Sequence, residues 1–568
     1  MDVVIERRAI SDSQMLDARL HPVLRRAYAA RGVRDSSELA LTLDRLVPVS
    51  TLESIEAAVL LVLEHRERRI MVIGDFDADG ATSTALIVRC LRCWGFASVD
   101  FLVPNRFEFG YGLTPEIVGL AAQRAPTLII TVDNGISSNA GVTAARERGI
   151  QVLITDHHLP GAVLPAADVI VNPNVPGSRF ASRALAGVGV AFYVMAAVRR
   201  ELETRGEVVS PAITDFLDLV ALGTVADLVP LDANNRVLVS QGIRRIRAGR
   251  AVPGILALLS IAGRNCASLT AADLGFSIGP RLNAAGRLDD MSIGIRCLLT
   301  DSESEALALA TRLDQLNVER REIEAKMQGV ALAAVSRLRD PGGPVRHGVC
   351  LFDPDWHQGV VGLVASRIKD RVRRPVIAFA LAGDGQLRGS ARSVPGIHIR
   401  DVLDRIAARH PELISRFGGH AMAAGLSLEE KDLDAFSVAF DTEVAALRDP
   451  AISSNRVETD GELTIDEIAL ETAQALRDGG PWGQAFPEPC FDGRFAVKSA
   501  RVVGDKHLKL WVTTADRSRA FDAIAFNFKG VEEVTALPDG EVRLVYRLDI
   551  NEYKGERRLQ LLVDHVLK

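Results

Sequence analysis

The stretch IMVIGDFDADG, residues 70–80, leads a short apolar segment directly into three aspartates at alternate positions. The apolar segment predicts a buried β-strand, and the polar residues after it mark the end of that strand. Three carboxylates packed this closely repel one another unless positive charge lies among them. The stretch therefore indicates both a strand of a buried sheet and a cation site at its end.

The apolar pattern recurs between residues 50 and 300, where short β-rich segments alternate with helical stretches, including 82–95 and 115–124. This alternation is typical of a parallel sheet with crossover helices, so an α/β fold is predicted. The segments are IMVI (70–73), VDFLV (99–103), TLIITV (127–132), VLIT (152–155) and VIVN (169–172).

Further along the chain, residues 301–338 show helical periodicity and many charges, which predicts a long connecting helix. DPGGP (340–344) ends it and opens a second α/β segment that runs to about 450. Five short β-rich segments after 457 predict a small barrel of OB type, although a five-stranded sandwich fits equally well. The expected parts are 1–49, 50–300, 301–340, 341–452 and 453–568.

The composition, with 48% apolar and 25% charged residues, is that of a soluble globular protein. A net charge of −6 argues against simple coating of nucleic acid, but residues 341–425 carry twelve Lys/Arg against seven Asp/Glu. Such segregation suits metal binding at one place and anion binding at another. The longest apolar run, 184–198, is fifteen residues and predicts a buried helix rather than a membrane span. Scattered cysteines and no signal-peptide core favour the cytoplasm.

Two more acidic motifs close predicted strands: VDNG follows 127–132, and TDHH follows 152–155. In LGTVADLVPL, Asp227 comes just after an apolar helix. Loops at the carboxyl ends of parallel strands converge on one crevice, so these residues are expected to share a space. Taken singly, each aspartate fits a helix N-cap or a turn, and the histidine pair fits a surface loop. The residues expected to meet are Asp75, Asp77, Asp79, Asp133, Asp156, His157, His158 and Asp227.

Carboxylate oxygens with one or two imidazoles suit Mn²⁺ or Mg²⁺, and the histidine favours Mn²⁺. So many carboxylates indicate two divalent cations, with Asp133 as a bridging ligand. Two ions about 3.5–4 Å apart are the usual arrangement for hydrolysing a phosphate ester. The sequence therefore predicts a two-metal phosphoesterase.

These ordered motifs resemble those of the DHH phosphoesterase superfamily, whose triplet stands here as Asp156-His157-His158. Longer segments resemble the RecJ-type single-strand-specific 5′-to-3′ DNA exonucleases, and the likeness extends from residue 70 to the end. They are IGPRLNAAGR (278–287), LNVERREIE (316–324), WHQGVVGLVASRI (356–368), GSARS (389–393), FGGHAMAAG (417–425), GPWGQAFPEPCFDG (480–493) and INEYKGERRLQLLVDHV (550–566).

The resemblance implies a DHH catalytic domain, a DHHA1 substrate-binding domain over 341–452 and an OB-fold nucleic-acid-binding domain over 453–568. Asp75 would be a ligand or a catalytic base, and His158 would face the scissile phosphate or only orient its neighbour. The implied metal ligands are Asp77, Asp79, Asp133, His157 and Asp227.

Several residues are candidates for binding the DNA. Ser390, Arg392 and His420 resemble DHHA1 substrate-binding elements, and Arg106 would cap a 5′-terminal phosphate. Each arginine also fits an ordinary solvated surface residue. Arg281, Asn283 and Arg287 would hold backbone phosphates near the metals. Trp511, Phe526, Phe528 and Tyr553 would stack on bases, unless they belong to the barrel core.

The expected function is exonucleolytic degradation of single-stranded DNA with a free 5′ end to 5′ mononucleotides, in DNA repair and recombination. Single-strand-binding protein and a RecQ-type helicase are partners that the resemblance implies, with no role for a membrane. The alternatives are a phosphodiesterase for short oligonucleotides or cyclic dinucleotides, a family pyrophosphatase, and a non-catalytic single-strand-binding scaffold.

Overall fold

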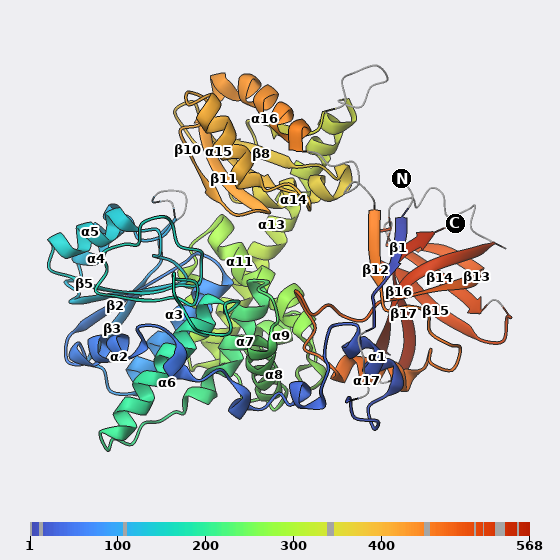
Figure 1. Cartoon of the computed structure of the whole chain (residues 1–568), viewed down its shortest axis with the longest axis horizontal. Helices are drawn as coiled ribbons and strands as arrows, with labels where there is room; N and C mark the ends of the chain where they lie inside the picture. Colours follow the sequence, from blue (N-terminus) through green and yellow to red (C-terminus); the bar gives the residue numbers. More distant parts are fainter. Residues whose placement is uncertain are drawn as a thin grey trace. The chain divides into compact units, whose positions relative to one another are not determined.

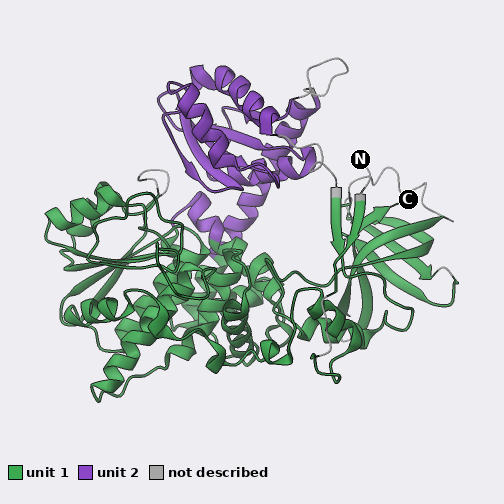
Figure 2. Cartoon of the chain, in the orientation of Figure 1, with its two compact units in different colours: residues 1–282, 291–311, 455–568 green, residues 283–290, 312–454 purple. Residues whose placement is uncertain are grey.

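The computed structural model describes residues 3–10, 15–105, 109, 111–337, 346–447, 455–504, 507–514, 516–528, 540–553 and 556–567. Two compact units make up the chain (Figure 2). Unit 1 comprises residues 1–282, 291–311 and 455–568, and unit 2 comprises residues 283–290 and 312–454.

Unit 1 contains the predicted parallel sheet, with strand order β3-β2-β4-β5-β6 (Figure 1). Every neighbouring pair is parallel, which confirms the α/β core. Strand β2 comes first along the chain among these five strands, yet it lies between β3 and β4. The direction in which strands are added therefore reverses between β2 and β4. Ligands of such sheets bind at the carboxyl ends beside this reversal. The strands are β2 (Arg69–Gly74), β3 (Ser98–Leu102), β4 (Leu128–Val132), β5 (Gln151–Thr155) and β6 (Val169–Val171).

Helices cover both faces of this sheet because successive strand side chains point in opposite directions. Met71, Ile129 and Val152 pack with α4 (Pro115–Ala122) and α5 (Asn139–Glu147) on one face. On the other face, α3 (Ala78–Cys93) packs on β2 and β3, and α6 (Gly187–Thr204) packs on β4 and β5. The apolar run 184–198 is largely buried in α6, as predicted.

A helical layer extends unit 1 beyond the sheet. In it, α7 (Leu217–Ala226) packs against α3, α6 and α8 (Ala233–Arg247). Within the described residues no single helix is long and apolar enough to cross a bilayer, although one pair bent by 81°, Leu43–Thr51 with Ile55–Glu64, meets the criteria of length and composition. The other helices beyond the sheet are α9 (Pro253–Ile261), α10 (Ala271–Asp273), the π-helix η6 (Leu274–Ile278), α11 (Gly279–Leu288), which begins in unit 1 and ends in unit 2, and α12 (Ser292–Leu299). Helix α2 (Ile55–Glu64) packs on α6 and β6.

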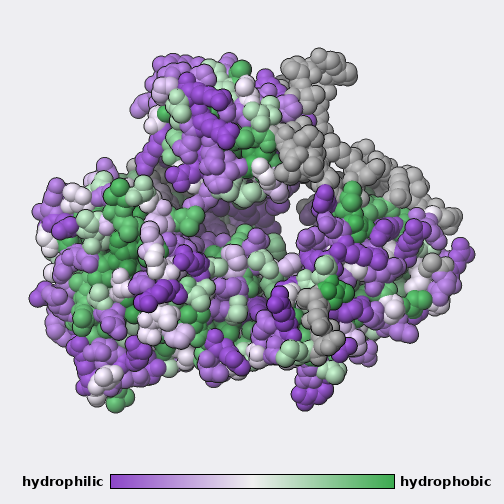
Figure 3. Space-filling model, in the orientation of Figure 1, coloured by the Kyte–Doolittle hydropathy of each residue, from purple (hydrophilic) through white to green (hydrophobic). Residues whose placement is uncertain are grey.

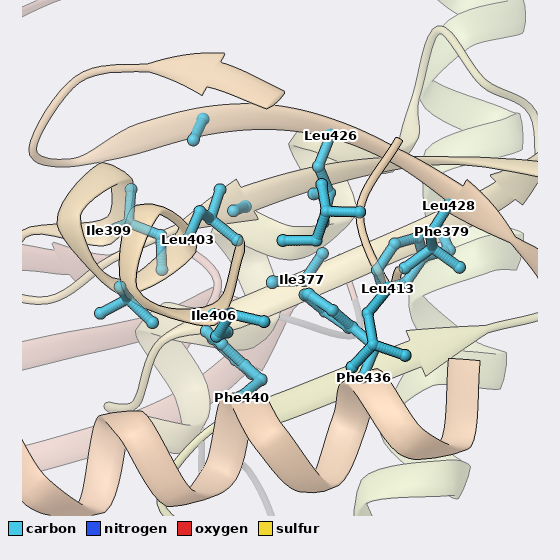
Figure 4. Packing of buried hydrophobic residues seen from close by; sticks show 14 of the residues in the cluster. Ile377, Phe379, Ile399, Leu403, Ile406, Leu413, Leu426, Leu428, Phe436 and Phe440 are labelled. Carbon is cyan, nitrogen blue, oxygen red and sulfur yellow. The ribbon is translucent and has the colours of Figure 1, made fainter. Parts of the chain in front are cut away.

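The predicted connecting helix is α13 (Glu303–Arg337), which begins in unit 1 and continues in unit 2. Unit 2 has a mixed sheet of order β10-β11-β9-β8-β7, confirming a second α/β domain. Figure 4 shows its core, where Phe379 packs with Phe436 and Phe440. The elements are β7 (Val349–Phe352), α14 (Val361–Val372), β8 (Val376–Leu381), β9 (Gln386–Arg392), α15 (Ile399–Arg409), β10 (Arg416–Gly419), β11 (Ala423–Glu429) and α16 (Leu433–Leu447).

The C-terminal strands form a closed barrel of order β13-β14-β15-β17-β16, which confirms the OB-type prediction and excludes the sandwich. On the face in Figure 3 the barrel is mostly hydrophilic, interrupted by scattered apolar residues. The strands are β13 (Phe491–Val503), β14 (His507–Thr514), β15 (Ala520–Ala525), β16 (Glu541–Tyr553) and β17 (Glu556–Leu567), preceded by α17 (Leu470–Asp478).

The N-terminal residues join this part of unit 1, a pairing that local sequence patterns do not predict. Strand β1 (Val3–Arg7) pairs in parallel with β12 (Asn455–Thr459). After α1 (Pro22–Ala29), Arg31 and Asp460 form a buried ion pair at 2.7 Å. Ion pairs and strand hydrogen bonds thus connect the start of the chain to the segment that leads into the barrel.

Candidate metal centre

The first carboxylates come from the loop between β2 and α3, at the reversal of strand order. Asp77 is the N-cap of α3, and its Oδ1 accepts a hydrogen bond of 3.0 Å from Gly80 N. Gly80 has to be a glycine, since a Cβ there would lie 2.5 Å from the carbonyl oxygen of Asp75. The N-cap alternative therefore holds for Asp77, and α3 begins earlier than the expected residue 82.

Asp79 is buried in the first turn of α3 and faces the start of α6. Its Oδ2 accepts a hydrogen bond from Gly187 N at 2.6 Å, and its Oδ1 accepts one from Val188 N at 2.9 Å. The amides at a helix N-terminus favour a negative charge. Burial and the nearby Asp77 carboxylate nevertheless raise the pKa of Asp79 to about 7. Two backbone amides therefore fix the position of this carboxylate, and a nearby cation would favour its ionised form.

Asp133 follows β4 in a left-handed conformation with φ of +61°. Among the described residues its buried Oδ1 accepts no hydrogen bond. Burial and the charges of Asp79, Asp77 and Asp227 raise its pKa well above the ordinary value. A buried carboxylate oxygen that accepts no hydrogen bond from the described residues calls for an explanation, and binding of a metal ion supplies one.

The Asp156-His157-His158 triplet follows β5, and Asp156 organises it. Its Oδ1 accepts hydrogen bonds from His157 N at 2.7 Å, His158 N at 3.1 Å and His158 Nδ1 at 2.8 Å, while its Oδ2 accepts one from Ile136 N at 2.9 Å. Burial opposes ionisation of Asp156, but the hydrogen bond from His158 lowers its pKa overall. Burial likewise opposes the charge on His158, yet its bond to Asp156 raises its pKa to about 9.

His157 connects the triplet to the aspartates. Its Nε2 lies 3.1 Å from Asp133 Oδ1 and 3.5 Å from Asp227 Oδ2, just past the end of α7. The residues form three overlapping groups. Within each group, one ligand atom from each residue lies within 4.8 Å of the others, and Asp133 and His157 each belong to two groups. The groups are Asp75, Asp77 and Asp133; Asp79, His157 and Asp227; and Asp133, His157 and His158.

The residues present therefore fit two neighbouring divalent cations. The donors are carboxylate oxygens with imidazole nitrogen, which suits Mn²⁺ or Mg²⁺. The predicted ligands do come together, and the unpartnered Oδ1 of Asp133 lies among them.

The structure also brings in residues that the sequence analysis missed. Tyr111 donates its hydroxyl to Asp133 O at 3.3 Å, and the hydroxyl lies 3.4 Å from His158 Nε2. Asn172 and Asn174 hold the carbonyl oxygens of His158 and His157, at 2.9 Å and 2.6 Å. The two asparagines follow strand β6 in VNPN, so the rule of polar residues at strand ends would have found them; no comparable signal marks Tyr111.

In unit 2, the expected phosphate-binding residues lie at one end of the sheet. Arg392 donates from Nη1 to Ser390 Oγ at 2.9 Å, and both side chains lie against Gly362, where a Cβ would be 2.9 Å from each. His420 is exposed in the turn between β10 and β11, and Ala423 after this turn pairs with Arg392. The three expected residues are therefore near one another.

Helix α11 carries the RLNAAGR motif. Asn283 and Arg287 are one helical turn apart and share a side, whereas Arg281, two residues before Asn283, lies on a different side. Arg281 donates to Ser277 O at 2.6 Å in unit 1, and Arg287 donates to Gly359 O at 3.1 Å in unit 2.

The remaining candidates differ in exposure. Trp511 and Phe526 are 47% and 57% exposed on the barrel, and Phe528 is half-buried. Arg106 and the side chain of Tyr553 lie outside the described residues.

Comparisons with known proteins agree with this architecture. The family models for the DHH family, N-terminal domain, the DHHA1 domain and the RecJ OB domain match residues 69–224, 342–446 and 459–565. The single-stranded-DNA-specific exonuclease RecJ of Escherichia coli (strain K12) is 52% identical over 575 residues, covering 99% of both chains.

Two solved structures are similar over the whole chain. RecJ from Thermus thermophilus in complex with Mn²⁺ is 30% identical, with a TM-score of 0.81 over 99% of this chain and 80% of that one. Its complex with Mg²⁺ gives 28% identity and a TM-score of 0.76, over 99% and 78%. With these domains in this order and half of its residues shared with a full-length relative, the chain belongs to the RecJ family.

Proposed function

We propose that this protein is a metal-dependent 5′-to-3′ exonuclease that degrades single-stranded DNA to 5′ mononucleotides, in DNA repair and recombination. One observation carries the proposal: His157 belongs both to a group with Asp79 and Asp227 and to a group with Asp133, and in each group the ligand atoms lie within 4.8 Å of one another. The relative from Escherichia coli, named a single-stranded-DNA-specific exonuclease, is 52% identical to the chain, and this supports the proposal.

The cofactors we propose are two divalent cations, Mn²⁺ or Mg²⁺, the ions present in the Thermus thermophilus complexes. Asp77, Asp79, Asp133, His157 and Asp227 would hold them. When bound, such ions activate water and stabilise the leaving oxygen of a phosphodiester. Asp75 lies beside this ligand set and would accept a proton from the attacking water.

His158 would contact the scissile phosphate. Its Nδ1 is bonded to Asp156, so its Nε2 is the ring nitrogen that can donate to a phosphoryl oxygen. A donor placed where negative charge develops stabilises the transition state. Asp156 therefore serves as a positioning residue rather than a ligand.

For substrate binding, we propose that Ser390, Arg392 and His420 hold backbone phosphates, together with Arg281, Asn283 and Arg287. Hydroxyl, guanidinium and imidazole donors suit phosphate oxygens. Arg106 would cap the 5′-terminal phosphate, as the family resemblance implies. The exposed Trp511 and Phe526 would stack on unpaired bases.

The domain limits we propose are 1–49 for an N-terminal segment, 50–300 for the DHH catalytic domain, 301–340 for the connecting helix, 341–452 for the DHHA1 domain and 453–568 for the OB fold. We also propose a cytoplasmic location, with single-strand-binding protein and a RecQ-type helicase as partners. Co-purification of each partner with the full chain tests the last point.

The function is tested with one oligonucleotide labelled at its 5′ or 3′ end, as a single strand and as a blunt duplex. The 5′-labelled strand should release labelled mononucleotide first, and the duplex should resist. Chelation should abolish cleavage and Mn²⁺ or Mg²⁺ should restore it, whereas Asp133→Ala should stay inactive with either ion. Efficient cleavage of dinucleotides with no preference for long strands would favour a phosphodiesterase for short substrates instead.

A further inference from the structure

Strand β9 of unit 2 carries an arginine beside the expected phosphate-binding residues that has no assigned role. Positions 388, 390 and 392 alternate along β9, so Arg388 points to the same face of the sheet as Ser390 and Arg392. Helix α14 packs on this face, because its Gly362 lies against Ser390 and Arg392. The direction of Arg388 agrees, since its Nη1 lies 3.4 Å from Oε1 of Gln358, just before α14.

The register of the sheet places a second arginine level with Arg388. Ser427 of β11 pairs with Arg388 on one side and with Arg416 of β10 on the other. Residues paired directly across neighbouring antiparallel strands point to the same face and have Cβ atoms about 5 Å apart. Arg388, Ser427 and Arg416 therefore form a row of two guanidinium groups around one hydroxyl group, called the arginine row below.

The sheet beside the arginine row is open to a ligand. In the next row, Gly425 pairs with Gly418 on one side and with Ser390 on the other. Both glycines are exposed, and a Cβ on either would meet nothing within 4 Å. Leu426 and Leu428, which alternate with Gly425 and Ser427, pack with α15 on the opposite face. A sugar-phosphate backbone can therefore lie on the glycine side without displacing a side chain.

The spacing of the rows suits a nucleic-acid backbone. Two residues along a strand span roughly 7 Å, so the arginine row lies about that far from the row of Ser390. Successive phosphates of an extended single strand are separated by a similar distance. The cationic strip ends one row further on, where Glu429 pairs with Gln386 and forms an ion pair with Lys431.

Protection of a sheet edge explains only part of the arginine row. Strand β10 is an edge strand, where a charged residue such as Arg416 hinders pairing with another chain. Arg388, however, lies on β9 between β8 and β11, where there is no edge to protect. A shared ligand accounts for both arginines.

We propose that the arginine row binds a backbone phosphate of the single strand, adjacent to the phosphate held by Ser390 and Arg392; this rests on the proposed function. Guanidinium groups donate paired hydrogen bonds to phosphate oxygens, and the Ser427 hydroxyl adds a further donor. Contacts to phosphates fix the register of a strand and carry no sequence information. The row would therefore fix the position of the strand in unit 2 without selecting its bases.

The test measures kcat/KM with Mn²⁺ on a series of oligothymidylates. One strand lacks the 5′-terminal phosphate, and each of the others carries one uncharged methylphosphonate, moved stepwise through the first linkages. The parent should lose about tenfold at the linkage that the arginine row binds, as expected for hydrogen bonds to a charged group. In Arg388→Gln/Arg416→Gln this loss should shrink to less than about twofold, because the partner of that phosphate is already gone.

The two proteins should also differ on the fully charged strand. There the double variant should be about tenfold slower than the parent, whereas on the strand that is neutral at the bound linkage the two should be about equal. A methylphosphonate at the scissile linkage should slow both proteins alike. In chelator, the slope of log affinity against log salt concentration should fall by about 0.7 in the double variant, the value for one phosphate of a single strand.

Arg400→Gln/Arg405→Gln is the matched control, because it removes the same charge from exposed positions of α15. That helix packs on the opposite face of the sheet. The control should keep the parental methylphosphonate profile. If the double variant unfolds earlier in urea than the parent, Arg416→Gln alone replaces it, since Arg416 is exposed on the edge strand, and the loss should shrink at the same linkage.

The proposal is overturned if these variants keep the parental profile, or if they lose rate equally on every strand. It is also overturned if the effect is confined to the 5′-terminal phosphate, or if the control shows the same change. A parent enzyme that cuts no single strand would instead refute the proposed function.

Discussion

Gly187 lies directly against two predicted metal ligands, and Gly187→Ala tests how exactly the ligands must be placed. Its amide donates to Asp79 Oδ2 at 2.6 Å, while a Cβ on this residue would lie 2.6 Å from Asp133 Cβ and 2.8 Å from Asp133 Oδ1. Nonbonded carbons rest about 3.5–4.0 Å apart, so the alanine methyl has to displace Asp133 or the start of α6 by about 1 Å.

A displacement of this size separates Asp79 from Asp133, two predicted ligands. Misplacing reacting groups by about 1 Å can lower a rate about 100-fold, so we expect kcat to fall by roughly that factor. Overpacking of this kind also destabilises by about 1–3 kcal/mol. The Mn²⁺ concentration for half-maximal activity should rise as well, because the ligand atoms no longer meet at the right spacing.

The assay follows nucleotide release from a 5′-phosphorylated single strand over a Mn²⁺ titration, alongside urea unfolding. Gly119→Ala in α4 is the matched control, since Gly119 is also a helical glycine but a Cβ added there would meet nothing within 4 Å. It should keep full activity and be as stable as the parent or slightly more so. Parental kcat and parental Mn²⁺ dependence in Gly187→Ala would refute the placement of Asp133 and Asp79 described above.

Asp156→Asn removes the negative charge that His158 Nδ1 contacts at 2.8 Å. We therefore expect kcat to fall about 10- to 100-fold with little change in KM for the strand. Steady-state kinetics measure both constants, and an unchanged kcat would contradict the positioning role of Asp156. Asp492 is buried, and although burial opposes its ionisation, hydrogen bonds from Arg7, Arg543 and Thr459 lower its pKa to about 2. An acid with a lowered pKa stabilises the fold above its ordinary pKa, near 3.8 here, and the stabilisation is lost as pH falls through about 2. After allowance for solvent around the exposed arginines, the stabilisation by Asp492 amounts to about 1–2 kcal/mol. Urea unfolding from pH 5 to pH 2 should show a smaller loss of unfolding free energy in Asp492→Asn than in the parent. Parallel curves of unfolding free energy against pH would contradict this role of Asp492. Trp511→Ala and Phe526→Ala should each weaken binding of a long single strand about fivefold without changing stability, measured by fluorescence anisotropy in chelator; unchanged affinity would leave both as ordinary surface residues.

Much of the centre was predictable because it depends on local patterns and one topological rule. The apolar segment at 70–73 identified β2, and the rule that parallel strands end at one edge brought Asp133 and His157 to the same place. The sequence could not tell which aspartate caps α3, because alternate carboxylates at 75, 77 and 79 offer the same chemistry. The structure shows that Asp77 caps α3 by accepting a hydrogen bond from Gly80 N, and that Asp79 accepts one from Gly187 N at the start of α6.

Other features depend on contacts between distant residues and left no local trace. Asp156 was expected only to share the space at the strand ends, and the sequence did not show that its oxygens accept hydrogen bonds from Ile136 and both histidines. The spacings of two and four in RLNAAGR did not show that Arg281 lies on a different side of α11 from Asn283 and Arg287, and binding of phosphates by the three residues stays a prediction. The tolerance of Leu228 for a left-handed backbone has no sequence signal at all.

The parallel pairing of β1 with β12 has a consequence for synthesis on the ribosome. Strand β1 emerges first, yet its partner begins at Asn455, so about 450 residues must be translated before the two can meet. At about 5–20 residues per second, the nascent chain carries this unpaired strand for roughly 20–90 s. The same delay applies to Arg7, whose partner Asp492 is made later still. The pairing of β1 and the ion pair of Arg7 can therefore be completed only after Asn455–Thr459 and Asp492 have been made.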